Sequence, residues 1–362
     1  MRVIVVGDGI VGAVAGYRLA AEGAEVLFVD AGHAGQATAA GAGIVFPWPV
    51  GGAGAGAEEF WWAAAAQYPV LLSQLERDGE PHAGFDRVGG ITITEDESVL
   101  PAAASMIRSI QERDRLVGDV EVLRVGEPAQ RFPALRDDLA GLFVGGVGRV
   151  DGQVMRDSLL RAAERHGARR ISGHARLSRA LSRVTGVEVD GEVIGAHAVV
   201  VAAGAWTASL CEPLGIDVPV APQRGQIAHL RLSGVDTSDW PVIRTTRDHY
   251  LLAFPGGKIV VGATREPGTG FDHRQTAGGV HKILSDALGV APGLADATLE
   301  EVRIGFRPLS SDNRPVIDSP MDGLVIATGL GASGLTLAPL TGTIAADLAL
   351  GRQSSLASSE TR

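Results

Sequence analysis

The sequence predicts an α/β protein with one parallel sheet assembled from separate segments of the chain and a second, α+β part that carries an antiparallel sheet. Three runs, residues 3–6, 198–202 and 324–328, are apolar or nearly so and contain no charged side chain. Such runs are typical of strands buried on both faces of a parallel sheet. Because the runs lie far apart in the chain, the segments between them are expected to form the second part.

The first of these runs opens a strand–turn–helix–strand unit. Residues 3–6 form the strand, residues 7–12 form the turn, and the helical pattern that follows ends at Gly23. The next strand, residues 26–29, stops at Asp30. Residues 35–43 are rich in Gly, Ala and Thr, which predicts an irregular loop rather than a regular element.

The remaining elements alternate between helical and strand patterns. Apolar residues at helical spacing predict helices, whereas alternation and short apolar runs predict strands. The expected helices cover residues 58–77, 100–116, 153–166 and 335–350, and the further strands cover residues 90–94, 226–232, 250–254 and 258–262. The glycine run at residues 51–56 receives no role.

Composition excludes several classes of protein. The 362 residues carry a net charge of −10, whereas a nucleic-acid partner requires a basic surface. The single cysteine, Cys211, excludes an internal disulfide, and the nine histidines show no metal-ligand spacing, so no metal is expected. No apolar stretch reaches the ~18 residues of a membrane span. Asp8 and the glycines interrupt the apolar N-terminal run, which argues against a signal peptide and for a cytoplasmic protein.

The turn GDGIVG at residues 7–12 has the spacing of a dinucleotide-binding motif. In such a turn Gly7 permits the tight bend, Gly9 lets the backbone approach a pyrophosphate, and Gly12 packs helix on strand. The start of the helix then faces the phosphates with its partial positive charge. Asp30 accepts hydrogen bonds from ribose hydroxyls and disfavours a 2′-phosphate, which leaves FAD or NAD.

A second motif, GLGASG at residues 329–334, also follows an apolar run and precedes a helix. The chain ends soon after that helix, so no later strand supplies a ribose-binding acid, and a second complete dinucleotide site is not expected. The motif is instead interpreted as a close backbone approach to the one cofactor, with the helix from Leu335 directing its N-terminus at a flavin. A simple helix-start turn is the alternative.

With both glycine motifs in view, the chain resembles the family of FAD-dependent amino-acid oxidases and dehydrogenases that includes glycine oxidase and D-amino-acid dehydrogenase. The resemblance covers nearly the whole chain. The segments that carry it, besides the N-terminal motif, are residues 35–43, 199–206 (VVVAAGAW), 250–264 (YLLAFPGGKIVVGAT), 305–315 (GFRPLSSDNRP) and 337–339 (LAP).

The resemblance implies one Rossmann-type FAD-binding domain made of residues 1–45, 150–218 and 306–362, and a substrate-binding domain made of residues 46–149 and 219–305. The FAD is expected to be non-covalent, because Cys211 lies away from the C-terminal glycine motif. The residues expected to contact FAD are Gly7, Gly9, Ile10, Val11, Gly12, Asp30, Ala31, Thr38, Ala42, Gly43, Ile44, Gly204, Trp206, Arg307, Gly331, Ala332, Ser333, Gly334 and Leu335.

The family implies oxidation of the C–N bond of an amino acid, with hydride transfer from Cα to flavin N5 and formation of an imine. Arg307 matches the arginine that binds the substrate carboxylate, and Tyr250 matches a tyrosine that orients the substrate. For each, an ordinary structural role is the alternative. Many relatives carry His or Arg where this chain has Leu330, Gly331 and Ala332, which implies a more open or more apolar pocket.

The expected partners are an amino acid or amine (a D-amino acid, glycine, an N-substituted glycine or a cyclic imino acid) and oxygen or another electron acceptor. No nucleic acid is expected, and an oligomer remains open. Two other functions stay open from the sequence. One is an NAD-linked dehydrogenase that uses the N-terminal motif, and the other is a non-catalytic FAD-binding subunit of an amine-oxidising complex.

Overall fold

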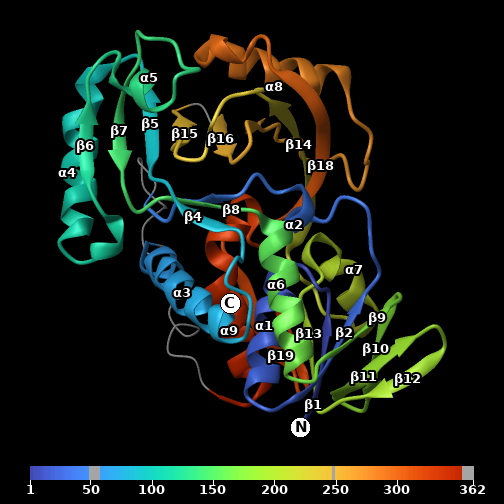
Figure 1. Ribbon diagram of the computed structural model, residues 1–362. Helices are drawn as coiled ribbons and strands as arrows, with labels where there is room; N and C mark the ends of the chain where they lie inside the picture. The colour runs from blue at the N-terminus through green and yellow to red at the C-terminus, as the bar shows by residue number, and fades with distance from the viewer. Residues whose placement is uncertain (49–57, 247–248, 353–362) are drawn as a thin grey trace.

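The computed structural model describes residues 1–48, 58–246 and 249–352, and the glycine run at residues 51–56 lies outside them. Its two large sheets confirm the predicted α/β fold class. The six-stranded sheet occupies the lower part of Figure 1 and the eight-stranded sheet the upper part. Residues 2–21 supply a strand and a helix of the lower part, so the N-terminal segment belongs to the fold.

The three apolar runs are neighbours in the six-stranded sheet. In sheet order its strands are β19 (Val316–Met321), β20 (Leu324–Thr328), β13 (Ala198–Val201), β1 (Arg2–Val6), β2 (Glu25–Asp30) and β9 (Arg169–Ser172). The pairs from β20 to β9 are parallel, and β19 alone runs antiparallel to its neighbour. The strands of this sheet therefore come from both ends and from the middle of the chain. The domain boundaries given above stay a prediction.

Both faces of this sheet are buried, which explains the continuous apolar runs. In β1, Val3 and Val5 pack under the helices of one face, and Ile4 and Val6 belong to the core of the other face. The helices are α1 (Ile10–Ala21), α3 (Glu58–Arg77), α6 (Gly152–Arg165) and α9 (Gly334–Ala349). The opposite face is covered by α7 (Thr207–Cys211) and by the small sheet of β10 (Ala175–Ala180), β11 (Arg183–Val189) and β12 (Glu192–Gly195).

The eight-stranded sheet is antiparallel except where β15 pairs with β5. In sheet order its strands are β18 (Thr298–Ser310), β14 (Val220–Arg231), β17 (Lys258–Gly262), β16 (Tyr250–Phe254), β15 (Val242–Thr245), β5 (Gly90–Thr94), β7 (Ala140–Val144) and β6 (Val120–Leu123). Helix α8 (Ala277–Val290) packs on one face, and α4 (Leu100–Gln111) packs on the other. A small sheet of β3 (Ile44–Val45), β8 (Gly148–Val150) and β4 (Phe85–Arg87) lies between the two large sheets (Figure 1).

Two expectations for local structure need correction, and one strand was not predicted. The loop predicted at residues 35–43 contains one helical turn, α2 (Ala37–Ala40), because its alanines favour a helix and Gly305 of β18 leaves room beneath it. The helix predicted at residues 100–116 ends at Gln111, and a short 3₁₀ turn follows, where Asp114 accepts the N–H of Leu116. Strand β18 was not predicted; it forms because it pairs with β14 along nearly its whole length.

Candidate active site

A cavity of about 400 Å³ extends from the six-stranded sheet to the eight-stranded sheet. One end lies at the carboxyl ends of β1, β2 and β13, which is where open parallel sheets bind their ligands. The other end is lined by residues of β14, β16 and β18, which belong to the eight-stranded sheet. The backbone ties the two ends together, because the N–H of Phe306 in β18 donates to the carbonyl of Gly35 (2.9 Å).

The structure brings most of the predicted site residues to this cavity. Gly12 and Ser333 are not among the residues that line it. The predicted residues that do are Gly7, Gly9, Ile10, Val11, Asp30, Ala31, Thr38, Ala42, Gly43, Ile44, Gly204, Trp206, Tyr250, Arg307, Gly331, Ala332, Gly334 and Leu335. Their contacts with a ligand stay predictions.

The first glycine turn is too tightly packed for side chains at two positions. Gly7 has a φ of +95°, and a Cβ there would lie 2.4 Å from the carbonyl oxygen of Ala202. A Cβ on Gly12 would lie 1.9 Å from the carbonyl oxygen of Gly7. Gly12 therefore acts from beneath the turn, where its lack of a side chain lets the first turn of α1 close onto β1.

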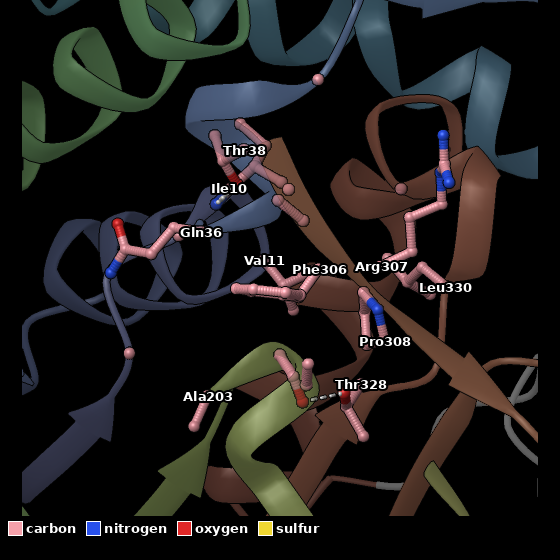
Figure 2. Close-up of a pocket in the computed structure, with 18 of the residues that line it drawn as sticks. Ile10, Val11, Gln36, Thr38, Ala203, Phe306, Arg307, Pro308, Thr328 and Leu330 are labelled. Atoms are coloured by element: carbon pink, nitrogen blue, oxygen red, sulfur yellow. Dashed lines mark hydrogen bonds between the residues drawn. The ribbon is translucent and has the colours of Figure 1, made fainter. Parts of the chain in front are cut away.

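The N-terminus of α1 faces the cavity as an anion-binding end. Its first turn carries no acidic residue, and the N-cap Gly9 offers no capping side chain. Figure 2 shows Thr38 beside this end, where its hydroxyl oxygen accepts the N–H of Ile10 (3.0 Å). The negative charge of the buried Asp8 does not repel an anion at this end, because Arg156 and Arg170 pair with its carboxylate.

Asp30 is oriented at the end of β2 by three donors. Its Oδ2 accepts the N–H of Asp8 (3.0 Å), and its Oδ1 accepts the N–H of Gly32 (2.7 Å) and the side-chain amide of Gln36 (2.9 Å). A carboxylate accepts about four hydrogen bonds. Asp30 therefore keeps acceptor capacity for a ribose hydroxyl while its position is fixed.

The second glycine motif borders the same cavity. Gly331 and Ala332 lie in a 3₁₀ turn, and α9 begins directly after it at Gly334. The first turn of α9 contains no acidic residue, so its positive end is available to a negative group in the cavity. In Figure 2 the hydroxyl of Thr328, at the end of β20, donates to the carbonyl of Gly204 (2.9 Å), which joins this wall to the turn after β13.

An aromatic stack lies near Asp30, and its His33, Trp206 and Phe306 rings line the cavity. The Trp206 ring lies between those of His33 and Phe271, with centroid distances of 4.7 Å and 4.8 Å. Phe306 meets Trp206 and Phe271 edge-on, so rings from four separate segments form one apolar surface. Sequence analysis predicted Trp206 alone, because nothing in the spacing of the other three indicates that they meet.

Arg307 lies at the opposite end of the cavity from Asp30. Its Nη1 donates to the carbonyl of Thr264 (3.1 Å), and its guanidinium lies beside the hydroxyl of Tyr250. A Cβ on Gly225 would come within 2.4 Å of that Nη1, so the missing side chain makes room for the guanidinium. Gly225 was not predicted; its strand pattern gives no sign that a side chain from β18 crosses it.

Burial shifts the pKa values of both groups at this end. It lowers the pKa of Arg307 and raises the pKa of Tyr250, although the positive charges of Arg307 and Arg265 act to lower the pKa of Tyr250. An arginine remains charged even when its pKa falls. The arrangement is therefore a partly buried cation beside a neutral phenol, which suits the binding of one carboxylate.

Comparison with known proteins identifies the family. The model of the FAD dependent oxidoreductases matches residues 2–348. The chain belongs to the family of FAD-dependent oxidoreductases. The protein is thus a flavoenzyme whose cofactor is FAD, which replaces the alternative of an NAD-linked dehydrogenase.

Relatives of this FAD-dependent oxidoreductase cover nearly its full length. The uncharacterized oxidoreductase YurR of Bacillus subtilis (strain 168) is 43% identical and aligns over 98% of this chain and 96% of its own. The crystal structure of iminodiacetate oxidase from Chelativorans sp. BNC1 has a TM-score of 0.95 and 41% identity, covering 99% of this chain and 98% of its own. The crystal structure of glycine oxidase from Geobacillus kaustophilus has a TM-score of 0.85 and 28% identity, covering 98% of this chain and 96% of its own.

The cavity of the oxidoreductase fits FAD on its own geometry. Side chains on Gly7 or Gly43 would collide with backbone carbonyl oxygens, so the backbone itself forms the cradle. Asp30 and the start of α1 fit the ribose and the pyrophosphate, and the start of α9 fits the negative side of a flavin ring. Within residues 1–48, 58–246 and 249–352, no group of His, Cys, Asp and Glu side chains is arranged to hold a metal. In the same ranges no helix is long and apolar enough to cross a membrane.

Proposed function

We propose that the protein oxidises the C–N bond of a small amino acid or N-substituted amino acid to an imine. The observation that carries the proposal is the partly buried guanidinium of Arg307 beside Tyr250, at the end of the cavity away from Asp30. Bound FAD supplies the two-electron acceptor for the hydride that leaves Cα. The imine then hydrolyses in water to a carbonyl compound and an amine.

In this proposal the chain contributes binding and orientation. Arg307 holds the substrate carboxylate through two parallel hydrogen bonds, which fixes the direction of the Cα–H bond. Its carbonyl partner Thr264 and the space at Gly225 keep the guanidinium in one place. Tyr250 has a raised pKa, so it is a neutral hydroxyl that donates to the carboxylate or to the amine.

No side chain needs to act as a general base when the amine enters unprotonated. Catalysis then rests on positioning and on the electrostatic field of the site. The names of two similar structures, an iminodiacetate oxidase and a glycine oxidase, support a substrate in the range from glycine to N-substituted glycines. D-amino acids and cyclic imino acids belong to the same proposed class.

The proposal also includes non-covalent FAD and a cytoplasmic location. Cys211 supports the first point because it is fully buried in the core beneath the six-stranded sheet. Burial raises the pKa of its thiol to about 11, which leaves it without a reactive thiolate. Release of the yellow colour into the supernatant after acid precipitation tests the linkage, and cell fractionation tests the location.

Anaerobic reduction of the flavin tests the proposed function. Glycine, sarcosine, iminodiacetate, proline and both enantiomers of alanine are added in turn, and the absorbance of oxidised flavin is followed. We expect at least one of these amines to bleach the flavin. A flavin that none of them reduces would instead favour a non-catalytic FAD-binding subunit. Reoxidation by oxygen, compared with an artificial acceptor, then separates an oxidase from a dehydrogenase.

A further inference from the structure

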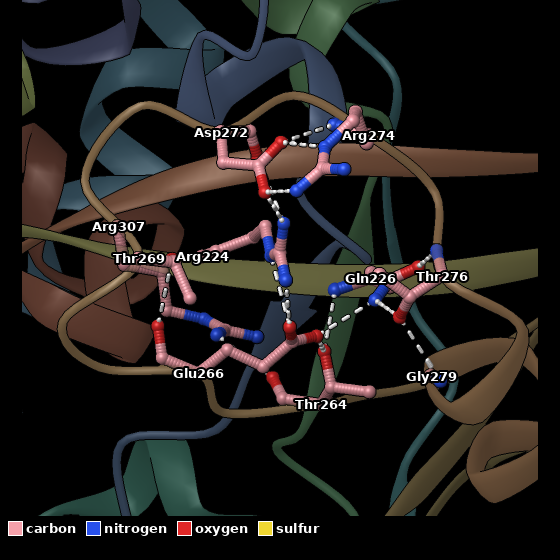
Figure 3. A network of polar contacts seen from close by, with 10 residues as sticks. All are labelled: Arg224, Gln226, Thr264, Glu266, Thr269, Asp272, Arg274, Thr276, Gly279 and Arg307. Atoms are coloured by element: carbon pink, nitrogen blue, oxygen red, sulfur yellow. Dashed lines mark hydrogen bonds and ion pairs between the residues drawn. The ribbon is translucent and has the colours of Figure 1, made fainter.

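A network of polar side chains lies behind the strand that the Arg307 side chain crosses (Figure 3). Arg224 and Gln226 of β14 alternate with Gly225, so their side chains point to the face of the sheet opposite to Arg307. Both side chains are buried. The network and the substrate end of the cavity therefore lie on opposite faces of β14, and only the backbone can join them.

The segment after β17 makes this connection. The N–H of Thr264 donates to the carbonyl of Gln226 (3.2 Å), and the backbones of Glu266 and Arg224 exchange two hydrogen bonds (2.9 and 3.2 Å). The carbonyl of Thr264 accepts Nη1 of Arg307 (3.1 Å), which is the contact with the cavity side. On the network side, the Thr264 hydroxyl accepts the N–H of Gln226 (2.9 Å) and donates to Oε1 of Glu266 (2.6 Å). Thr264 thus contacts both faces.

Glu266 lies at the centre of the network. Besides the Thr264 hydroxyl, its Oε1 accepts Nε2 of Gln226 (2.7 Å), and its Oε2 accepts Nε of Arg224 (2.9 Å). Although burial acts to raise the pKa of Glu266, the hydrogen bonds from these three side chains hold it below its usual range. Glu266 is therefore ionised. Its charge also reaches the cavity side, because it acts to raise the pKa of Arg307.

The network is anchored at two further points. Nη1 of Arg224 lies 2.8 Å from Oδ2 of Asp272, where the same segment returns to β14. Nε2 of Gln226 donates to the hydroxyl of Thr276 (2.9 Å), and Oε1 of Gln226 accepts the N–H of Thr276 (3.1 Å). Thr276 is the N-cap of α8. Glu266 is thus held both by β14 and, through Gln226, by a helix that packs on the sheet.

We propose that Glu266 is a positioning residue for the substrate carboxylate: it fixes the carbonyl of Thr264 at the place from which that carbonyl orients the guanidinium of Arg307. The inference rests on the proposed function, in which Arg307 binds the carboxylate. Glu266 is not among the residues that line the cavity, so it acts through Thr264 and Arg307 and not by touching the substrate. A guanidinium held in one orientation meets both oxygens of a carboxylate at once.

Position and charge predict opposite results when Glu266 is made neutral. A negative charge near Arg307 reduces the attraction of a carboxylate, so the loss of that charge alone would tighten binding. Loss of the fixed carbonyl would weaken binding, because the guanidinium would no longer meet both carboxylate oxygens. The direction of the change in affinity therefore separates a positioning role from an electrostatic one.

Binding of methoxyacetate, an unreactive ether with one carboxylate, tests the inference without turnover. It is titrated into the oxidised holoenzyme while the flavin spectrum is followed. We expect Glu266→Gln to raise the Kd about tenfold, because the new amide brings N–H donors against the donors of Gln226 and Arg224. The Tm and the ratio of flavin to protein absorbance show that the variant is folded and holds FAD. An unchanged or lower Kd would overturn the inference.

Thr264→Val tests the link between Glu266 and the carbonyl. It keeps the charge of Glu266 and the carbonyl that Arg307 contacts, and removes the hydroxyl that donates to Oε1 of Glu266. We expect the Kd for methoxyacetate to rise about fivefold, and Glu266→Gln to add less than about twofold in this background. An unaltered Kd in Thr264→Val, or the full effect of Glu266→Gln on top of it, would contradict a route through Thr264.

Glu300→Gln is the matched control for a general structural effect. Oε1 of Glu300 in β18 accepts Nε of Arg231 in β14 (2.7 Å), so the substitution breaks an ion pair of the same kind at the other end of the same two strands. We expect it to leave the Kd unchanged. In the Arg307→Ala background, Glu266→Gln is expected to add nothing, because the guanidinium that it positions is gone. A further loss in that background, or an equal loss in Glu300→Gln, would refute the positioning role.

Anaerobic reduction of the flavin separates failure of this inference from failure of the proposed function. With the amine that bleaches the flavin best, we expect Glu266→Gln to raise the half-saturating concentration about tenfold and to change the limiting rate less than about threefold, the pattern of lost binding. If the half-saturating concentration is unchanged, the inference fails and the proposed function stands. If no amine reduces the flavin, the proposed function fails, and the methoxyacetate titrations still decide whether Glu266 positions Arg307.

Discussion

The guanidinium of Arg307 in β18 fills the space that a side chain at Gly225 in the neighbouring strand β14 would take. Gln223 and Gly225 of β14 lie on the same sheet face as Arg307, because Gln223 pairs directly with Arg307 and alternate residues share a face. The missing Cβ at Gly225 lets the guanidinium cross the strand toward Thr264 and Tyr250. The position of the Arg307 guanidinium thus depends on the absence of a side chain at Gly225.

Replacing Arg307 tests the carboxylate site. We expect Arg307→Ala to raise the apparent KM about 100-fold or more, since a bidentate charged contact is lost, while FAD stays bound. Steady-state kinetics with the best amine of the panel gives the KM, and the ratio of flavin to protein absorbance gives the FAD content. An unchanged KM would remove Arg307 from the substrate site.

Replacing Gly225 tests the space that Arg307 requires. The new Cβ of Gly225→Ala would meet the flexible end of the Arg307 side chain, so we expect that end to move and the fold to remain. The predicted result is an increase in KM of about tenfold with little change in Tm. In the Arg307→Ala background the same substitution is expected to add nothing; an additional rise there would point to a different cause.

At the scale of elements, the packing of α1 against α9 fixes the relative positions of the two helix N-termini that face the cavity. They pack closely because Gly342 of α9 has no side chain: a Cβ there would lie 2.6 Å from Cβ of Val14 and 2.8 Å from the carbonyl oxygen of Val11. Val11 belongs to the first turn of α1, beside the cavity. The distance between the helices is therefore linked to the shape of the cofactor site.

Gly342→Ala is expected to force α9 away from α1. Overpacking of this kind costs about 1–3 kcal/mol, which exceeds the gain in helix propensity, so the free energy of unfolding and the affinity for FAD should both fall. Gly289→Ala in α8 is the matched control, because a Cβ there meets nothing within 4 Å. That variant is expected to gain up to about 1 kcal/mol. Denaturant unfolding measures both, and equal stabilities of the two variants would refute the close packing.

At the scale of the whole molecule, two histidines in the core link stability to pH. His229 in β14 and His249 before β16 are both buried, and burial lowers the pKa of each to about 4. Arg303 and Lys258 lower the pKa of His229 further, and Glu301 acts in the opposite direction. In the unfolded chain each histidine titrates near 6.5, so the unfolded state binds more protons between the two values.

The free energy of unfolding should therefore be constant above about pH 6.5 and fall as the pH drops toward 4. Between pH 7 and pH 5 each histidine is expected to lower the free energy of unfolding by about 2 kcal/mol. Denaturant unfolding at a series of pH values measures the decrease. In the double variant His229→Leu with His249→Leu the slope in this window should be smaller. A slope equal to that of the unchanged protein would assign the pH dependence to other groups.

Local pattern predicted much of the fold. The apolar runs of β1, β13 and β20 and the glycine turn before α1 were recognisable, because burial on both faces and a tight turn each restrict the residue types nearby. Strand β18 was missed, since long-range pairing with β14 stabilises it and its own residues do not alternate clearly. Helix α2 was missed because Gly305, far away in the chain, provides the space beneath it.

The sequence by itself determined the nucleotide-binding unit, the FAD family and Arg307 as the candidate carboxylate ligand, because each is marked by adjacent residues or by resemblance. Only the tertiary structure decided that Arg265 joins Arg307 at the cavity, that Gly225 makes room for it, and that Trp206 stacks with His33 and Phe271. These residues come from different strands and loops, and no local periodicity records which of them meet. Their contacts arise from sheet pairing over long sequence distances, which only the folded chain specifies.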